Sequence, residues 1–185
     1  MTALNCLRDP VRLEEARRAR DLDPERREIL RRLVVLAAEL ADAPVALVTI
    51  VDGERQTFAA HYGLPDELAA AGQTAIDYSL CQFAVTSGRP LIVEELAADP
   101  MLRGHPAHDV LGVASYAGVP VVTGSGQALG TVCVLDFVPR GWPDDVLARL
   151  ALLADLASDQ FDLQAHERRE AFRRTWQAIP EHSRW

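Results

Sequence analysis

The sequence predicts an α+β domain with a central antiparallel sheet and with N- and C-terminal helices packed on one face. Three observations support this prediction. Two pairs of apolar strands are each joined by a short turn, helices with an apolar stripe flank them, and strands do not alternate with helices as in a parallel sheet. The chain has 185 residues, 49% of them hydrophobic, so one core of ordinary size can be buried. We expect five strands.

The first two helices are expected over residues 11–22 and 24–41. Asp23 is a typical N-cap, and Pro24 suits the first position of the second helix. The apolar residues of that helix recur every three to four positions, so one stripe should face the core. The sequence Asp42-Ala43-Pro44 should end it.

A first hairpin is expected over residues 45–63, with its turn at Gly53 and Glu54. The alternation in its second strand, though imperfect, places Phe58 and Ala60 on the same face. Residues 64–78 are mixed in composition and predict a loop with a short helical turn.

The middle of the chain predicts a short helix over residues 80–87, with Ser79 before it as a possible cap. A strand should begin at Leu91, and residues 99–109 should form an irregular loop. A second hairpin then spans residues 114–136, turning at residues 123–126.

A long final helix begins at Pro143 and can continue to Trp176, with Pro180 as a stop. Such a helix is about 50 Å long. Because a small domain is narrower than that, the distal part must project or dock on a partner. We therefore divide the chain into an N-terminal arm with a short helix (1–23), a central domain (24–160) and a C-terminal helical extension (161–185).

The formal net charge of −8 argues against nucleic acid or an anionic membrane as the main partner. No apolar run approaches the ~20 residues that cross a bilayer, and no secretion signal is evident, so we expect a cytoplasmic protein. All basic side chains are arginines, and they gather near the two ends of the chain beside acidic residues. We interpret them as solvated helix faces with i,i+4 ion pairs.

Three cysteines, Cys6, Cys81 and Cys133, lie far apart in the sequence, which argues against a disulfide framework and a zinc site. Cys81 falls in the first turn of a predicted helix, where a thiol can be reactive. A small buried core residue is the favoured interpretation, as it is for Cys133. Cys6 falls in an N-terminal arm that we expect to be frayed.

The sequence contains no phosphate-binding glycine loop, nucleophile elbow or zinc-protease histidine pair. His105 and His108 lie in the irregular loop without obvious companion ligands, so we expect exposed histidines and no metal. We therefore predict that the chain is not an enzyme.

Four stretches of the chain resemble the GAF domain family, especially its stand-alone bacterial members, whose fold is similar to that of PAS domains. They are residues 43–65, residues 78–100 with the Ser-Leu-Cys helix, residues 112–121 with Tyr-Ala-Gly-Val-Pro, and residues 128–136 with Leu-Gly-Thr-Val-Cys-Val-Leu-Asp. Their order and spacing carry the resemblance.

The resemblance implies a ligand cavity on the sheet face opposite the terminal helices, roofed by residues between the third and fourth strands. The residues expected near that cavity are Asp77, Tyr78, Cys81, Gln82, Phe83, Leu102, Arg103, Ser115 and Tyr116. The ligand or cofactor stays unknown. Arg103-Gly104 stands where bilin-binding members carry Cys-His, so a covalent bilin is not expected. The 105–116 loop lacks the catalytic thiol of the free-methionine sulfoxide reductases, and the cyclic-nucleotide motif is absent.

Two functional classes follow from this resemblance. In the first, the chain is a sensor that binds a small molecule and signals through its terminal helices, within a homodimer or to a separate signalling protein. In the second, it is a ligand-free dimerisation module. A thiol redox sensor that acts through Cys81 is a third, minor hypothesis. The residues expected at a helical dimer interface are Leu33, Leu36, Leu40, Leu150, Leu153 and Ala157.

Overall fold

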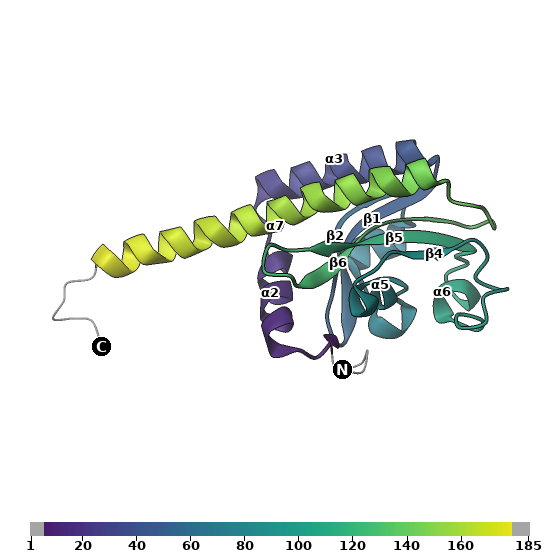
Figure 1. Ribbon diagram of the computed structural model, residues 1–185, viewed down its shortest axis with the longest axis horizontal. Helices are drawn as coiled ribbons and strands as arrows, with labels where there is room; N and C mark the ends of the chain where they lie inside the picture. Colours follow the sequence, from purple (N-terminus) through teal and green to yellow (C-terminus); the bar gives the residue numbers. More distant parts are fainter. Residues whose placement is uncertain (1–5, 179–185) are drawn as a thin grey trace.

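The computed structural model describes residues 6–178 and contains one six-stranded antiparallel sheet, with helices above and below it (Figure 1). The strand order is β3-β2-β1-β6-β5-β4. The strands are β1 (Val45–Val51), β2 (Arg55–Tyr62), β3 (Gln73–Ala75), β4 (Leu91–Val93), β5 (Ser115–Val122) and β6 (Ala128–Asp136).

The antiparallel α+β fold is confirmed, but the expected number of strands was one too few. The missed strand, β3, has three residues and pairs only with β2 at the edge of the sheet. The segment predicted as a loop with a helical turn also holds α4 (Asp66–Ala71) before β3 and the 3-10 helix η1 (Ile76–Tyr78) after it.

Two long helices, α3 (Pro24–Ala41) and α7 (Asp144–Ala178), lie side by side on one face of the sheet (Figure 1). The predicted start of α3 is confirmed, because the Asp23 carboxylate accepts a hydrogen bond from the backbone N–H of Arg26 at 2.9 Å. The helix ends at Asp42, whose left-handed backbone lets Ala43 N–H bond to the carbonyl of Ala38. Pro180, the predicted stop of α7, lies outside the described residues.

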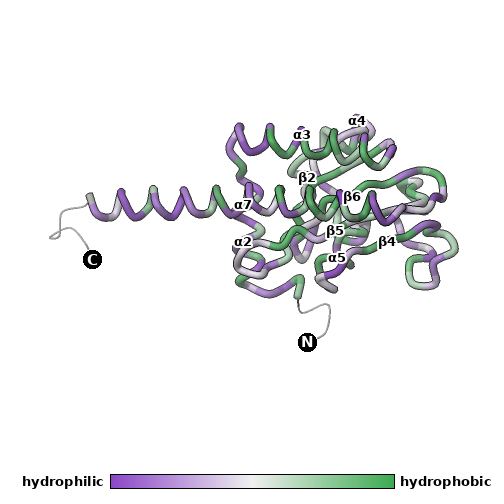
Figure 2. Tube along the Cα trace, turned by 45° about the horizontal axis from the view of Figure 1, so that its top comes forward, coloured by the Kyte–Doolittle hydropathy of each residue, from purple (hydrophilic) through white to green (hydrophobic). Residues whose placement is uncertain are grey.

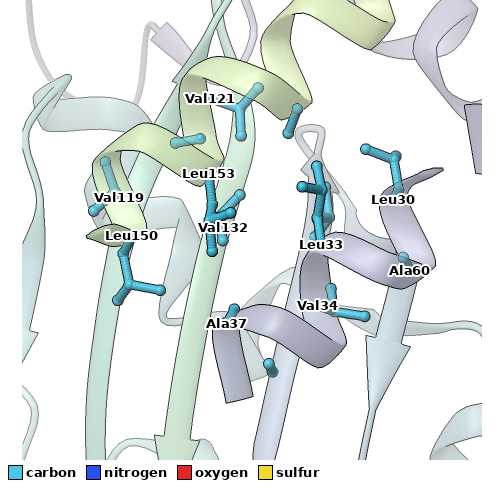
Figure 3. Packing of buried hydrophobic residues seen from close by; sticks show 14 of the residues in the cluster. Leu30, Leu33, Val34, Ala37, Ala60, Val119, Val121, Val132, Leu150 and Leu153 are labelled. Carbon is cyan, nitrogen blue, oxygen red and sulfur yellow. The ribbon is translucent and has the colours of Figure 1, made fainter. Parts of the chain in front are cut away.

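The helix-side cluster is the apolar core between the sheet and these helices. Figure 3 shows side chains of α3 (Leu30, Leu33, Val34 and Ala37) and of α7 (Leu150 and Leu153) gathered with Val119, Val121 and Val132 of the sheet. Leu33, Leu150, Leu153 and Ala157 are all buried there. Their assignment to a dimer interface is therefore wrong, because the chain's own sheet covers them. Leu36 is exposed and Leu40 is half-buried.

The opposite face of the sheet carries α5 (Cys81–Ser87) and α6 (Pro106–Asp109), below the sheet in Figure 1. The cavity-side cluster is the second apolar core, which lies beneath this layer. Its members include Val45, Leu47 and Val51 of β1, which alternate with the helix-side residues Ala46, Val48 and Ile50. The sheet thus separates two distinct cores.

A β-bulge in β2 corrects the expected facing of its side chains. Val48 of β1 pairs with Ala60, but the next residue, Thr49, pairs with Phe58, so Ala59 is the extra residue. Phe58 consequently packs against the cavity-side cluster, whereas Ala60 lies in the helix-side cluster. The prediction that both share one face is wrong.

Helix α2 (Pro10–Arg20) lies across one end of the sheet and carries the buried Arg12 (Figure 1). Its guanidinium donates to four backbone carbonyls: those of Cys6 and Leu7 in the arm, Val51 of β1 at 2.7 Å, and Ala128 of β6. Burial lowers the pKa of Arg12. The arm around Cys6 is therefore tied to the sheet, in contrast to the frayed arm that we predicted.

The arginines near the chain ends are only partly solvated. The i,i+4 pairs of Glu14 with Arg18 and of Glu28 with Arg32 form as predicted. Arg26, in contrast, has a side chain only 12% exposed between Asp23 and Glu167, the latter at 2.8 Å. This ion pair joins the start of α3 to the outer part of α7.

The distal part of α7 extends past the rest of the domain (Figure 1) and is mostly hydrophilic (Figure 2). The N-terminal part of α7 packs on β5, β6 and α3, and Gln164 is the last residue of the helix whose side chain is buried. Arg168 still bonds to Asp21 at the end of α2. No helix within residues 6–178 is both long and apolar enough to cross a membrane.

Candidate functional site

A cavity of about 60 Å³ lies between the sheet and the layer that carries α5 and α6. The sheet contributes its floor through Leu47, Gln56, Phe58, Thr74, Tyr116, Cys133 and Leu135. The roof comes from segments between the strands and after β6, namely Leu64, Pro65, Leu68, Tyr78, Leu80, Cys81, Ala107, Leu111, Val113 and Phe137. None of these lining residues is an aspartate, glutamate, arginine or histidine.

Three of the nine predicted site residues line this cavity: Tyr78, Cys81 and Tyr116. The others do not reach it. Leu102 is buried in the cavity-side cluster, Asp77 and Arg103 are exposed, and Ser115 donates its hydroxyl to the carbonyl of Val138 at 2.9 Å. Their role as lining residues is not supported by the geometry.

Gln82 and Phe83, the two remaining candidates, fasten the roof from outside the cavity. The Gln82 side-chain amide donates to the carbonyls of Ile76 at 2.8 Å and Ser79 at 2.9 Å, which ties η1 to α5. Phe83 packs edge-on against His105, with the ring centroids 5.8 Å apart. Both residues therefore hold neighbouring roof segments together.

His105 is half-buried, which corrects the expectation of an exposed loop histidine. Its Nδ1 accepts a hydrogen bond from the backbone N–H of Ala107 at 3.1 Å and so caps α6. Burial lowers the pKa of His105, against the opposing effect of Asp77 and Asp109. The neutral ring fits this role, because a protonated Nδ1 could not accept that bond. No cluster of potential metal ligands occurs in the described part of the chain.

The polar groups of the cavity come mostly from the sheet. Gln56 is buried and accepts a hydrogen bond from the Ser79 hydroxyl. The Thr74 hydroxyl oxygen is buried and has no hydrogen-bond partner within residues 6–178. Leaving a buried hydroxyl unpaired costs about 1–3 kcal/mol. Thr74 is thus a lining residue with a hydrogen bond still to make.

A second polar group of the cavity is a cluster of two thiols and three hydroxyls. The sulfurs of Cys81 and Cys133 are 3.8 Å apart, and the Tyr116 hydroxyl donates to the Cys81 sulfur at 3.2 Å. Next to them, the hydroxyls of Thr49 and Thr131 lie 3.1 Å apart, where β1 and β6 cease to pair. All five residues are buried, as we predicted for both cysteines.

The contacts within this cluster shift the pKa values of its two thiols in opposite directions. Burial raises the pKa of Cys81, but hydrogen bonds outweigh that effect and bring it to about 6; they involve Cys133, Thr131, Tyr116 and Thr49. The pKa of Cys133 is raised, first by its hydrogen bond to Cys81 and then by burial. Burial also raises the pKa of Tyr116, which stays a donor. The cluster therefore stabilises one thiolate, on Cys81.

Sequence reasoning missed the part of the lining that precedes β3 and follows β6. Leu64 and Leu68 stand four residues apart beside α4, a helical spacing that could have indicated a buried edge. Gln56 was assigned to a strand without a function. Phe137 gave no signal, because it is an apolar residue just past the end of β6.

A model of the GAF domain family matches residues 23–162 of the chain. Among curated proteins, a cyclic di-GMP phosphodiesterase of Pseudomonas aeruginosa is 32% identical over 115 residues, which is 62% of this chain. The match spans only 19% of that protein's length.

Solved structures with similar folds are 15–21% identical to the chain, so they inform on the fold alone. The GAF domain of a phosphoenolpyruvate-protein phosphotransferase from Coxiella burnetii gives a TM-score of 0.64 over 92% of this chain and 99% of that one. The free methionine-R-sulfoxide reductase of Neisseria meningitidis gives 0.62 over 90% and 95%. The PixJ GAF domain of Thermosynechococcus elongatus gives 0.61 over 84% and 95%.

Proposed function

This chain belongs to the GAF domain family, and on that premise we propose that it is a non-enzymatic regulatory module that binds a small uncharged molecule. The cavity between the sheet and the α5–α6 layer is the proposed site. The observation that carries the proposal is its lining: apolar side chains, a few polar groups, no acidic or basic residue, and the unpaired hydroxyl of Thr74.

The lining has no arginine or histidine to pair with an anionic ligand and no carboxylate to pair with a cationic one, and the Cys81 thiolate is already held by the Tyr116 hydroxyl. An uncharged ligand therefore fits the cavity best, because a buried charge needs a partner. A cyclic dinucleotide carries two phosphates, and no arginine lines the cavity to meet them. We therefore do not assign cyclic di-GMP, named for the Pseudomonas relative, to this site. Free methionine sulfoxide, an amino acid charged at both ends, fits the lining equally poorly.

The size of the cavity limits the ligand as well. A space of about 60 Å³ corresponds to roughly four to six water molecules at ~10–15 Å³ each. A ligand that enters without moving the roof has only a handful of non-hydrogen atoms. One hydroxyl or carbonyl group would satisfy Thr74, and an apolar body would contact Leu47 and Leu111.

The output is proposed to pass through the sheet to the helices. Leu47 lines the cavity, and its neighbours Ala46 and Val48 belong to the helix-side cluster, so a shift of β1 acts on both cores. Signalling requires that the ligand bind one helix arrangement more tightly than another. Exposed leucines on α7, Leu152 and Leu156, form a face for a second copy or a separate signalling protein.

A ligand-free dimerisation module is the alternative function. The exposed apolar side chains of α7 favour it as much as they favour a sensor, since either would use them to contact a second copy. Whether a compound binds in the cavity distinguishes the sensor from the dimerisation module. A site that no compound enters supports the dimerisation module alone.

The test is a thermal-shift screen of small neutral compounds on the purified chain after unfolding and refolding to remove bound material. We expect at least one compound to raise the Tm, and native mass spectrometry should show one bound molecule per chain. Ala107→Phe fills the cavity and should abolish the shift, whereas the matched control Val110→Phe changes an exposed neighbour and should retain it. Equal shifts in both variants, or no shift with any compound, would overturn the proposal.

A further inference from the structure

Two thiols from distant parts of the chain meet in the wall of the cavity. Cys81 is the first residue of α5 and Cys133 lies in the middle of β6, yet their sulfurs are 3.8 Å apart. Both are buried and both line the cavity. Anything small that enters the cavity therefore meets the two sulfurs together.

The third cysteine has a different setting. Cys6 is half-buried beside α2, where Arg12 bonds to its backbone carbonyl, and it does not line the cavity. It supplies an internal control, because reagents in bulk solvent reach it without entering the cavity.

We propose that Cys81 and Cys133 form a dithiol site for small apolar hydroperoxides, which convert the pair to a disulfide through a sulfenic acid on Cys81. This proposal rests on the same cavity as the proposed function and assigns a second chemistry to its wall. The apolar lining selects the class of oxidant, since an alkyl hydroperoxide is neutral and carries an apolar body.

The reaction balances in two steps. The Cys81 sulfur attacks the terminal oxygen of the hydroperoxide, the O–O bond breaks, and the thiol's proton ends on the departing alkoxide, which gives Cys81 sulfenic acid and an alcohol. The Cys133 sulfur then attacks the Cys81 sulfur, an S–S bond forms, and the hydroxyl leaves with the Cys133 proton as water. The two thiols lose two electrons, which the hydroperoxide gains.

The contacts of the cluster favour Cys81 as the attacking sulfur. The Tyr116 hydroxyl points its hydrogen at Cys81 and stabilises a thiolate there. Cys133 is held protonated beside it, since burial and the Cys81 thiolate both oppose a second charge. Attack by Cys81 followed by closure with Cys133 is therefore the expected order.

Closure needs only a small movement. Bonding distance is about 2.05 Å, so the two sulfurs must approach by about 1.8 Å. Because the backbone of Cys133 is fixed in a strand paired on both sides, any backbone movement that accompanies closure is expected in α5. Gln82 and Phe83 link α5 to η1 and His105, so the roof of the cavity would move with it.

The experiment treats the reduced chain with tert-butyl hydroperoxide, whose six non-hydrogen atoms suit a cavity of about 60 Å³, then denatures it, alkylates the remaining thiols and maps the peptides by mass spectrometry. We expect a linked Cys81–Cys133 peptide, the loss of two hydrogen atoms from the intact mass, reversal by dithiothreitol, and Cys6 still alkylated. Cys133→Ser should stop the reaction at a Cys81 sulfenic acid that dimedone traps. Cys6→Ser is the matched control and should form the same link as the parent chain.

Several results would overturn this proposal. The first is that Cys81 and Cys133 stay reduced after Cys6 has been oxidised. The second is a disulfide that includes Cys6. The third is a disulfide that forms only once circular dichroism shows unfolding. The test is independent of ligand sensing. Thermal shifts without a disulfide refute only the dithiol site, and a disulfide without any thermal shift refutes only the proposed ligand.

Discussion

The ring of Tyr116 lies across Gly118, two residues further along β5, so closely that a Cβ added at residue 118 would stand 2.1 Å from the Tyr116 hydroxyl oxygen. Side chains two apart on a strand share a face, so only glycine leaves room for the ring to lie flat along the sheet. That position lets the hydroxyl reach Cys81 on α5. The glycine therefore sets the geometry of the thiol cluster.

Gly118→Ala is expected to destabilise the chain by about 1–3 kcal/mol, because the added methyl group overpacks the site and displaces the Tyr116 ring. Urea unfolding followed by circular dichroism measures the change. Gly53→Ala is the matched control: its methyl group would meet only ordinary contacts, 3.5 Å or more away, and should change stability by less than about 0.5 kcal/mol. Equal effects of the two substitutions would refute this account.

Tyr116→Phe should raise the pKa of Cys81 from about 6, because it removes a hydroxyl that donates to the thiolate. A hydrogen bond to a charged group contributes about 1.5–3 kcal/mol, which corresponds to a rise of about 1–2 in pKa. Titration of the thiolate by ultraviolet absorbance, with Cys6 replaced by serine, follows the change. Tyr62→Phe alters an exposed tyrosine and should leave the curve in place.

The two cysteines should make stability depend on pH in opposite senses. The pKa of Cys81, about 6, lies below its unfolded value of about 8.5, so the unfolded chain binds more protons between them and stability rises with pH in that window. The pKa of Cys133 is raised above its unfolded value, so stability falls as pH rises beyond about 8.5.

The double substitution Cys81→Ala with Cys133→Ala isolates this effect. The difference in unfolding free energy between the parent and this variant should be largest near pH 8 and should shrink on both sides. A difference that stays constant from pH 5 to 10 would mean that neither thiol has a perturbed pKa in the folded chain.

Arg12→Met is expected to destabilise the chain by at least about 2 kcal/mol, because it leaves buried carbonyls of the arm and the sheet without their donor. Arg18→Met, on the same helix, removes only an exposed pair with Glu14 and should cost less than about 1 kcal/mol. Thermal and urea unfolding measure both. If the two variants melt alike, the buried guanidinium contributes no more than a surface ion pair.

A second copy is expected to bind the exposed apolar side of α7. Leu152 and Leu156 lie one turn apart and are 64% and 48% exposed. Replacing both with aspartate should halve the mass measured by light scattering at micromolar concentration. Val11→Asp, at an equally exposed site on α2, should leave the mass unchanged. A parent chain that is already monomeric would contradict the proposed dimer.

The local signals of the sequence predicted most of the fold. Asp23 and Pro24 mark the start of α3, and both hairpins form where strands meet short turns. β3 escaped prediction because its three residues are ordered only by pairing with β2. The facing of Phe58 was wrong because a single extra residue, Ala59, inverts the alternation, and no local pattern marks a bulge.

The site was less predictable than the fold, because its residues meet across long sequence separations. The periodicity of Leu150 and Leu153 indicates a buried face, but a sheet of the same chain and a second copy produce the same pattern. Arg12 gave no sign of burial, since its acceptors on β1 and β6 are 39 and 116 positions away. The pairing of Cys81 with Cys133 likewise depends on how α5 lies over β6.

Helix α7 is a single helix of 35 residues, and its Arg168 is held by Asp21 at the end of α2. The ten residues that follow extend about 15 Å past that anchor. A tilt of about 10° at the anchor would carry the tip sideways by about 2.6 Å, because the segment beyond the anchor is about 15 Å long. Under the proposed function, a slight change in the angle of α7 on the sheet would therefore become a larger displacement at the far end of the helix.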